Sequence, residues 1–183
     1  KPFFCEKPAG LSFNEAKILK NLHMKYKSKN MIGFNRRFYS NIIKGIDFIN
    51  KNGGIRAIEI KGHERFWLKK NIINKKLINN WNFANNIHMI DLIDYLGGKI
   101  KKINIIKKSH KFKKNNYVNT NFEFTNSIIG NYLSYWDSPG GWSIKLYGNK
   151  KTIVFDPLEN GYIIDEKFKK KIIHLDKFDK KFK

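Results

Sequence analysis

A series of short segments in which apolar and polar residues alternate most constrains what this chain can fold into. Alternation with a period of two is typical of β-strands that bury one face and expose the other. The segments lie at residues 58–61, 102–105, 121–124, 144–147, 152–155, 162–164 and 172–175. So many of them predict a mostly antiparallel, open sheet with helices packed on one face.

The first 35 residues have a different pattern. An apolar segment at 3–6 is followed by the capping box Ser12-Phe-Asn-Glu15, a helix to about residue 26 and a second apolar segment at 31–34. A strand, a helix and a strand in this length predict two parallel strands. Parallel sheets need cover on both faces, so we expect the first segment to end a buried strand in the tail of a larger α/β domain. The predicted fold class is therefore α/β to α+β.

Apolar residues at helical spacing predict two further helices. The first spans residues 40–52, and its inward residues are Ile42, Ile43, Ile46 and Ile49. The second lies within residues 79–98, and its apolar stripe is Met89, Leu92, Ile93 and Leu96. We expect the lysine-rich end of the chain, from residue 177, to fray.

His88 is the residue of chemical interest in the second helix. Asn85 or Asn86 would cap the start of this helix, and Gly97-Gly98 would end it. His88 would then lie in the first turn, where the positive end of the helix dipole favours a neutral imidazole. Such a ring can accept a proton from a substrate hydroxyl. The alternative is a histidine that only caps or packs.

The net charge of +22 raises the possibility of a nucleic-acid-binding protein. Only four of the 37 basic residues are arginine, and the lysines are scattered among many Asn and Ile residues. Proteins that read bases lean on arginine for bidentate contacts. This composition indicates a nucleotide bias of the encoding genome, so we expect no specific nucleic-acid partner.

Length and composition allow one ordinary domain with a substantial core. The chain has 183 residues, of which 41% are hydrophobic, and it lacks an apolar run of about 20 residues. The single cysteine, Cys5, cannot form an internal disulfide, and the chain does not open with a signal peptide. We therefore expect a cytoplasmic protein with no membrane span. The other histidines lack metal-ligand spacing, so we expect no metal site.

Four motifs occur in a fixed order along the chain. They are Phe4-Cys-Glu-Lys-Pro8, Gly33-Phe-Asn-Arg-Arg-Phe38, the segment from His88 to Gly97, and IKLYGNKKTIVFDPL at residues 144–158. Together they resemble the glucose–fructose oxidoreductase / inositol dehydrogenase (Gfo/Idh/MocA) family. The resemblance implies an NAD(P)-dependent dehydrogenase with an N-terminal Rossmann domain and a C-terminal α/β domain whose open sheet makes oligomer contacts.

The resemblance also implies a domain division. The Gly-rich GxGxxG turn that binds the dinucleotide pyrophosphate in such domains has no match in this sequence. Residues 1–35 therefore look like the C-terminal remnant of a Rossmann-type domain, and residues 36–183 like the substrate and oligomerisation domain. We expect this fragment alone to be inactive.

Some site residues follow from the resemblance. Lys7 matches the lysine that lies between nicotinamide and substrate, and His88 matches the catalytic histidine. The expected cofactor contacts, to NAD or NADP, are Glu6, Lys7, Pro8, Asn35 and Arg36. Without the motifs, Lys7 would be an ordinary turn lysine, and Asn35 and Arg36 a solvated strand end.

The sequence departs from the family pattern at Ala84. The family often has an aspartate there, four residues before the histidine, where it binds substrate. An amide of Asn85 or Asn86 can hold a sugar hydroxyl but cannot act as a charged partner. Asp91 can orient His88, or it is an ordinary structural carboxylate. The full set of expected substrate contacts is Asn85, Asn86, Asp91, Trp81 and Trp136.

Two roles are open for the tryptophans. Trp81, Trp136 and Trp142 can stack on sugar faces, or they are core and interface aromatics. The function that we expect is an oxidoreductase acting on a hydroxyl of a sugar, a sugar derivative or a cyclitol, in a homo-oligomer. The alternative is a binding or oligomerisation domain that kept the fold without the chemistry.

Overall fold

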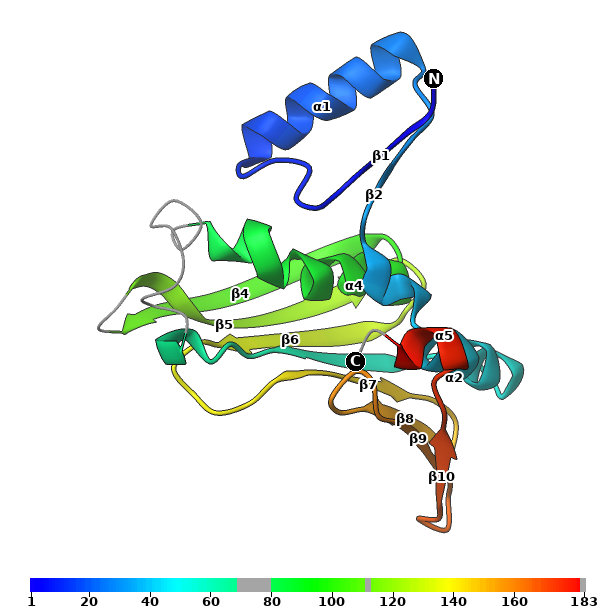
Figure 1. Cartoon of the computed structure of the whole chain (residues 1–183). Helices are drawn as coiled ribbons and strands as arrows, with labels where there is room; N and C mark the ends of the chain where they lie inside the picture. The colour runs from blue at the N-terminus through cyan, green and yellow to red at the C-terminus, as the bar shows by residue number, and fades with distance from the viewer. Residues whose placement is uncertain (69–79, 111–112, 182–183) are drawn as a thin grey trace.

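The computed structural model describes residues 1–68, 80–110 and 113–181. It contains a small parallel sheet of two strands and a large sheet of eight. Figure 1 shows the small sheet and its helix as a separate unit above the helices that cover the large sheet. The predicted fold class is confirmed.

The small unit is a strand–helix–strand segment. Strand β1 (Phe3–Cys5) pairs in parallel with β2 (Asn30–Ile32), and helix α1 (Phe13–Tyr26) connects them. The hydroxyl of Ser12 accepts a hydrogen bond from the Glu15 amide at 3.2 Å, as a capping box requires. The carboxylate of Glu15 accepts in turn from the Leu11 amide at 2.6 Å, one residue before the expected partner.

The expectation that β1 is buried was wrong for the described residues. Phe3 and Phe4 are 55% and 63% exposed, and α1 buries none of its residues. Two strands and one helix offer too little surface to enclose a parallel pair, which needs cover on both faces.

The large sheet is almost entirely antiparallel. Its strand order is β10-β9-β8-β7-β3-β6-β5-β4, and β3 and β6 form its one parallel pair among the described residues. The strands are β3 (Ala57–Gly62), β4 (Ile100–His110), β5 (Lys113–Phe124), β6 (Ile129–Tyr135), β7 (Trp142–Tyr147), β8 (Thr152–Phe155), β9 (Gly161–Ile164) and β10 (Lys170–Ile173). The helices bury one face of the central strands, and there the alternation seen in the sequence follows from that burial. On the edge strand β4 the expectation was wrong: residues 100–109 are all exposed, Ile103 at 49% and Ile105 at 42%.

Helices α2 (Ser40–Lys51) and α4 (Ile87–Gly97) cover one face of this sheet (Figure 1). The main core lies between them and the sheet. The prediction that Ile43 faces inward on α2 was wrong, since Ile43 is 46% exposed. Neighbouring residues of an α-helix point about 100° apart, so the residue next to the fully buried Ile42 turns toward solvent. Among the described helices, none has both the length and the apolar character that crossing a bilayer requires.

Helix α4 ends where the sequence predicted. Gly98 follows it with φ +79°, a conformation that glycine adopts without strain. Gly97 has a second role: a Cβ there would lie 2.2 Å from the Phe124 ring on β5. The absence of a side chain therefore lets the end of α4 lie directly on the sheet.

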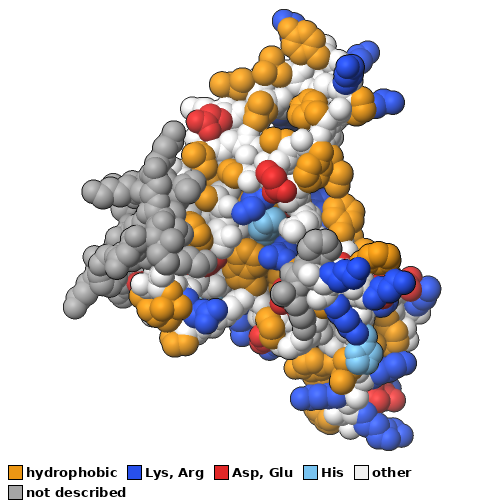
Figure 2. All heavy atoms as spheres, viewed as in Figure 1, with side chains coloured by type: hydrophobic (Ala, Val, Ile, Leu, Met, Phe, Trp, Pro, Cys, Tyr) orange, Lys and Arg blue, Asp and Glu red, His pale blue; other side chains and the backbone are white. Residues whose placement is uncertain are grey.

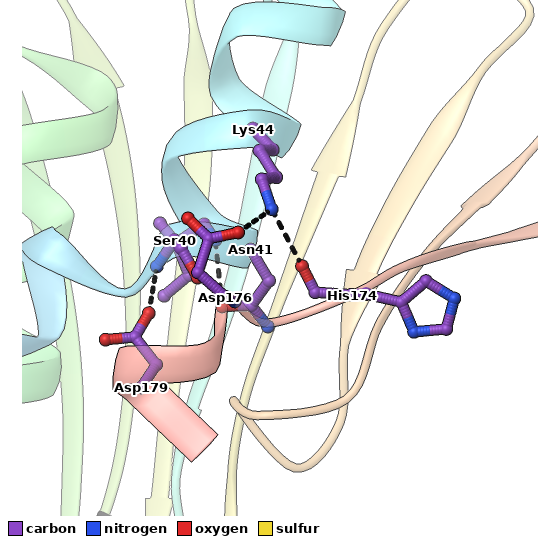
Figure 3. Close-up of polar contacts among 7 residues, drawn as sticks. Ser40, Asn41, Lys44, His174, Asp176 and Asp179 are labelled. Carbon is purple, nitrogen blue, oxygen red and sulfur yellow. Dashed lines mark hydrogen bonds and ion pairs between the residues drawn. The ribbon is translucent and has the colours of Figure 1, made fainter. Parts of the chain in front are cut away.

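The C-terminal segment does not fray through residue 181, contrary to expectation. It forms the short helix α5 (Lys177–Lys180), which lies at the start of α2 (Figure 3). The Ser40 amide donates to Asp179 Oδ2 at 2.7 Å, and the Ser40 hydroxyl accepts from the Asp176 amide at 2.8 Å. Lys44 pairs with Asp176 and donates to the His174 carbonyl at 3.1 Å. The end of the chain thus supplies the cap that α2 lacks in its own sequence.

We predict that Asp179→Ala lowers the free energy of unfolding by about 1 kcal/mol, the usual value of a lost helix cap. Asp179→Asn keeps an acceptor oxygen and should lose less. Urea denaturation followed by circular dichroism measures both. Equal stability of wild type and Asp179→Ala would show that the contact does not cap α2.

Candidate functional site

The site forms where the small unit meets the start of α4. Lys7 follows β1, and its Nζ donates to the Ala84 carbonyl oxygen at 2.6 Å across 77 residues of sequence. Ala84 lies in the π-helical turn η3 (Asn82–Asn86), which leads directly into α4 and its His88. Lys7 and the histidine segment, predicted to share a site, are therefore brought together.

His88 lies almost fully inside this junction. It is 6% exposed, and its ring centroid lies 6.4 Å from that of Phe34 and 5.9 Å from that of Trp142. Burial, together with the positive charges of Lys7 and Arg36, lowers the pKa of His88 to about 4. Its Nδ1 is buried and lacks a hydrogen-bond partner among the described residues. The ring is therefore neutral near pH 7.

The neutrality of His88 was predicted, but for the wrong reason. Helical structure begins at Trp81 and continues through η3 into α4, and the Asn86 side chain makes no capping hydrogen bond. Neither Asn85 nor Asn86 caps the helix, because their amides bind a carboxylate from another segment instead. His88 is thus beyond the first turn, where the dipole effect has faded. Burial and two cations account for the shift.

Arg36 and Arg37 follow β2 in the short 3₁₀ helix η1 (Asn35–Phe38) and have different environments. Arg36 lies against aromatic rings, with its Cζ 4.8 Å from the centroid of Tyr39 and 5.6 Å from that of Trp142. Burial lowers the pKa of Arg36, and its Nε is buried without a partner among the described residues. Arg36 therefore places a half-buried positive charge beside Trp142 and His88.

Asp91 does not orient His88, which corrects that expectation. Its two carboxylate oxygens accept from Arg37 Nε and Nη2, each at 2.5 Å. This bidentate pair raises the pKa of Arg37 and joins η1 to α4. The family motifs include both residues, but their sequence positions did not indicate the pair.

Glu64 is the functional candidate that the sequence analysis missed. It follows β3 through His63 and is only 3% exposed. Its Oε1 accepts from Asn85 Nδ2 at 2.6 Å and from Trp142 Nε1 at 3.2 Å. The neighbours of Asn86 orient its amide so that Nδ2 also lies 3.0 Å from this oxygen. No motif of the sequence marks this carboxylate.

The tryptophans separate into two environments. Trp81 and Trp136 are 8% and 4% exposed and pack with Phe66 in a small second core, so the structural reading fits them. Trp142 instead borders His88 and Arg36. Asn86 is fully buried, whereas Asn85 is partly exposed.

The remaining predicted cofactor contacts lie around Lys7. Glu6 and Asn35 are exposed, Pro8 is partly buried, and all three follow the carboxyl ends of β1 and β2. Figure 2 shows Lys or Arg, His, and Asp or Glu side chains gathered on the face between the small unit and the sheet. In the described part of the chain, no three His, Cys, Asp or Glu side chains gather in a way that could hold a metal ion.

We predict that Lys7→Met raises the pKa of His88, because it removes one of the two positive charges that oppose protonation. Titration of the His88 ring by NMR measures the change. Lys99→Met, which removes a charge at the far end of α4, is the control and should leave this pKa unchanged. An unaltered pKa in Lys7→Met would contradict the proximity of the two groups.

We also predict a pH dependence of stability. The pKa of His88 is about 4 in the folded chain against 6.5 for the free side chain, so the unfolded chain binds the extra proton between these values. Stability should therefore fall as the pH falls from 6.5 to about 4. His88→Gln cannot take up this proton and should show a shallower fall in melting temperature. If the melting temperatures of wild type and His88→Gln fell equally with pH, His88 would not be buried as a neutral ring.

Comparisons with known proteins agree with the motifs. No family model matches the chain. It is 27% identical to glucose-6-phosphate 3-dehydrogenase of Bacillus subtilis over 169 residues, which are 85% of this chain and 42% of that protein.

Among solved structures, the chain matches levoglucosan dehydrogenase in complex with NADH and L-sorbose, with a TM-score of 0.78 and 16% identity, over 95% of this chain and 54% of that one. It matches UDP-N-acetylglucosamine 3-dehydrogenase of Acidithiobacillus ferrooxidans with a TM-score of 0.71 and 17% identity, over 94% and 55%. The chain spans about half the length of these proteins. Its resemblance to the Gfo/Idh/MocA dehydrogenases is thus confirmed, by one relative in sequence and by several structures in fold.

Proposed function

We propose that the protein containing this chain is an NAD(P)-dependent oxidoreductase that acts on a hydroxyl of a sugar, a sugar derivative or a cyclitol. The observation that carries the proposal is the meeting of Lys7 with the His88 helix, from segments far apart in sequence. A neutral imidazole can accept the proton of a hydroxyl, and a nearby cation can stabilise the negative charge that develops on the oxygen. The pKa of about 4 makes His88 a weaker base than a free imidazole. The relatives named above are dehydrogenases that act on sugars or sugar derivatives.

In this proposal His88 accepts the proton of the reacting hydroxyl. Lys7 holds positive charge beside the same oxygen and stabilises the negative charge that develops on it. When bound, the nicotinamide supplies the hydride acceptor. The charges of Lys7 and Arg36 disfavour a lasting imidazolium, so His88 releases the proton to bulk water after the hydride has left the substrate.

The cofactor would bind at the small unit. Parallel strands of a doubly wound sheet bind dinucleotides at their carboxyl ends, and the residues after β1 and β2 are Glu6, Lys7, Pro8, Asn35 and Arg36. Within the described part of the chain, Nε of Arg36 and Nδ1 of His88 have no hydrogen-bond partner, and a polar group that reached this place would supply one. We therefore assign residues 1–35 to the dinucleotide-binding part and residues 36–183 to the substrate domain.

The proposal also includes a homo-oligomer and a cytoplasmic location. A homo-oligomer through the large sheet is supported by exposed isoleucines on its edge strand β4, such as Ile103 and Ile105. A cytoplasmic location stays a prediction that rests on the single, unpaired Cys5.

Ala84 favours a second candidate, a binding domain without chemistry. The residue there offers only a backbone carbonyl, and Lys7 binds it. In that case the protein would bind sugar or partner chains and would not turn over cofactor.

The test is turnover by the full-length gene product. NAD⁺ or NADP⁺ is mixed with glucose 6-phosphate, levoglucosan or UDP-N-acetylglucosamine, and the absorbance of the reduced nicotinamide is followed. We expect turnover with at least one sugar, and a loss of about 100-fold or more in kcat for His88→Gln and Lys7→Met.

The control is His174→Gln, which changes an exposed histidine away from the site and should keep full activity. Full activity in both His88→Gln and Lys7→Met would overturn the assignment of the two residues. Sugar binding without turnover in the wild type would favour the second candidate.

A further inference from the structure

We propose that Glu64 is a positioning residue that fixes the side-chain amide of Asn85, so that Asn85 presents its oxygen as the acceptor for a substrate hydroxyl. This inference rests on the proposed function. It assigns a specificity device to a carboxylate that neither the motifs nor the expected site includes.

The first step is the fixed position of Glu64 itself. Its backbone amide donates to the Tyr135 carbonyl at 3.1 Å, which anchors the segment after β3 to the end of β6. The side chain is 3% exposed. A carboxylate this deep is held in place by the donors around it, because an unsatisfied buried charge is costly.

The second step is the convergence of donors on one oxygen. Oε1 of Glu64 receives hydrogen bonds from Asn85 and Trp142. With the Asn86 amide turned so that its oxygen faces the donors Ser134 and Trp136, its Nδ2 adds a third at 3.0 Å. Asn85 and Asn86 come from η3, and Trp142 comes from the start of β7. One carboxylate therefore ties together the two segments that border His88.

The third step concerns the direction of the Asn85 amide. Its Nδ2 lies 2.6 Å from Glu64, so the donor end faces the buried carboxylate and the acceptor end faces away from it. Asn85 is partly exposed, and it follows Ala84, the residue bound by Lys7. The amide oxygen is therefore the end of the side chain left for a ligand, one residue from the carbonyl that Lys7 binds, and we infer that it accepts from a substrate hydroxyl there.

The position of Trp142 also depends on Glu64. Its indole nitrogen lies 3.2 Å from Glu64, and its ring lies 5.9 Å from that of His88. Loss of the carboxylate should therefore release the indole as well as the amide. This gives a readout that does not depend on turnover.

The experiment is a double-mutant cycle in the full-length protein, with the sugar that is turned over best. We expect Glu64→Ala and Asn85→Ala each to raise KM about 10-fold or more and to change kcat less. Because Glu64 acts through Asn85, the double variant should be no worse in KM than either single one. Glu64→Gln keeps an acceptor oxygen and is the matched control, with KM within about threefold of wild type. The proposal would be overturned if KM of the double variant rose by the product of the two single increases. An unchanged KM in Glu64→Ala would also overturn it.

NMR of protein labelled with ¹⁵N at tryptophan and asparagine gives the second measurement. We expect slow exchange of the Asn85 side-chain amide protons, and a Trp142 indole signal that moves in Glu64→Ala and stays in Glu64→Gln. Trp142→Phe assigns that signal. If no sugar is turned over, the proposed function fails while these signals still decide the role of Glu64. Fast exchange of the Asn85 side-chain amide protons in the wild type would overturn the role proposed for Glu64.

Discussion

The hydrogen bond from Lys7 to the Ala84 carbonyl is the contact on which the site depends. The small unit buries little of its own surface, so its position over the large sheet rests on a few such contacts. The Arg37–Asp91 pair is the second, and it joins η1 to α4 next to the same place. Together they set the residues that follow two parallel strands against the helix that carries His88.

The charges around His88 follow from this placement. Lys7 and Arg36 both act on the ring, and the structure satisfies the other arginine, Arg37, with Asp91. An imidazole between two cations stays neutral, and its protonation is opposed by charge as well as by burial. The same surroundings that limit the stability of the chain at low pH keep the His88 ring unprotonated near neutral pH.

Much of the fold could be predicted because its signals are local. The strand at 152–155 coincides with β8, the parallel pair follows from a strand–helix–strand order, and Gly98 ends α4. The predictions that were wrong concern which residues pack against, or hydrogen-bond to, a given side chain. Ile43 has the right residue type but lies outside the buried stripe, and Asn85 turns to a carboxylate instead of capping the helix. Propensity describes a residue and its neighbours along the chain, not what packs against it.

The sequence by itself determined most of the alternating strands and the helices, and it predicted Lys7 and His88 as site residues through motifs that resemble a known family. Only the tertiary structure decided why His88 is neutral, which arginine is paired, and that Glu64 lies behind Asn85. Glu64 follows β3 and lies 21 residues from Asn85 and 78 from Trp142, so no local pattern joins the three. Hydrogen bonding and charge act through space, and the folded sheet sets those distances.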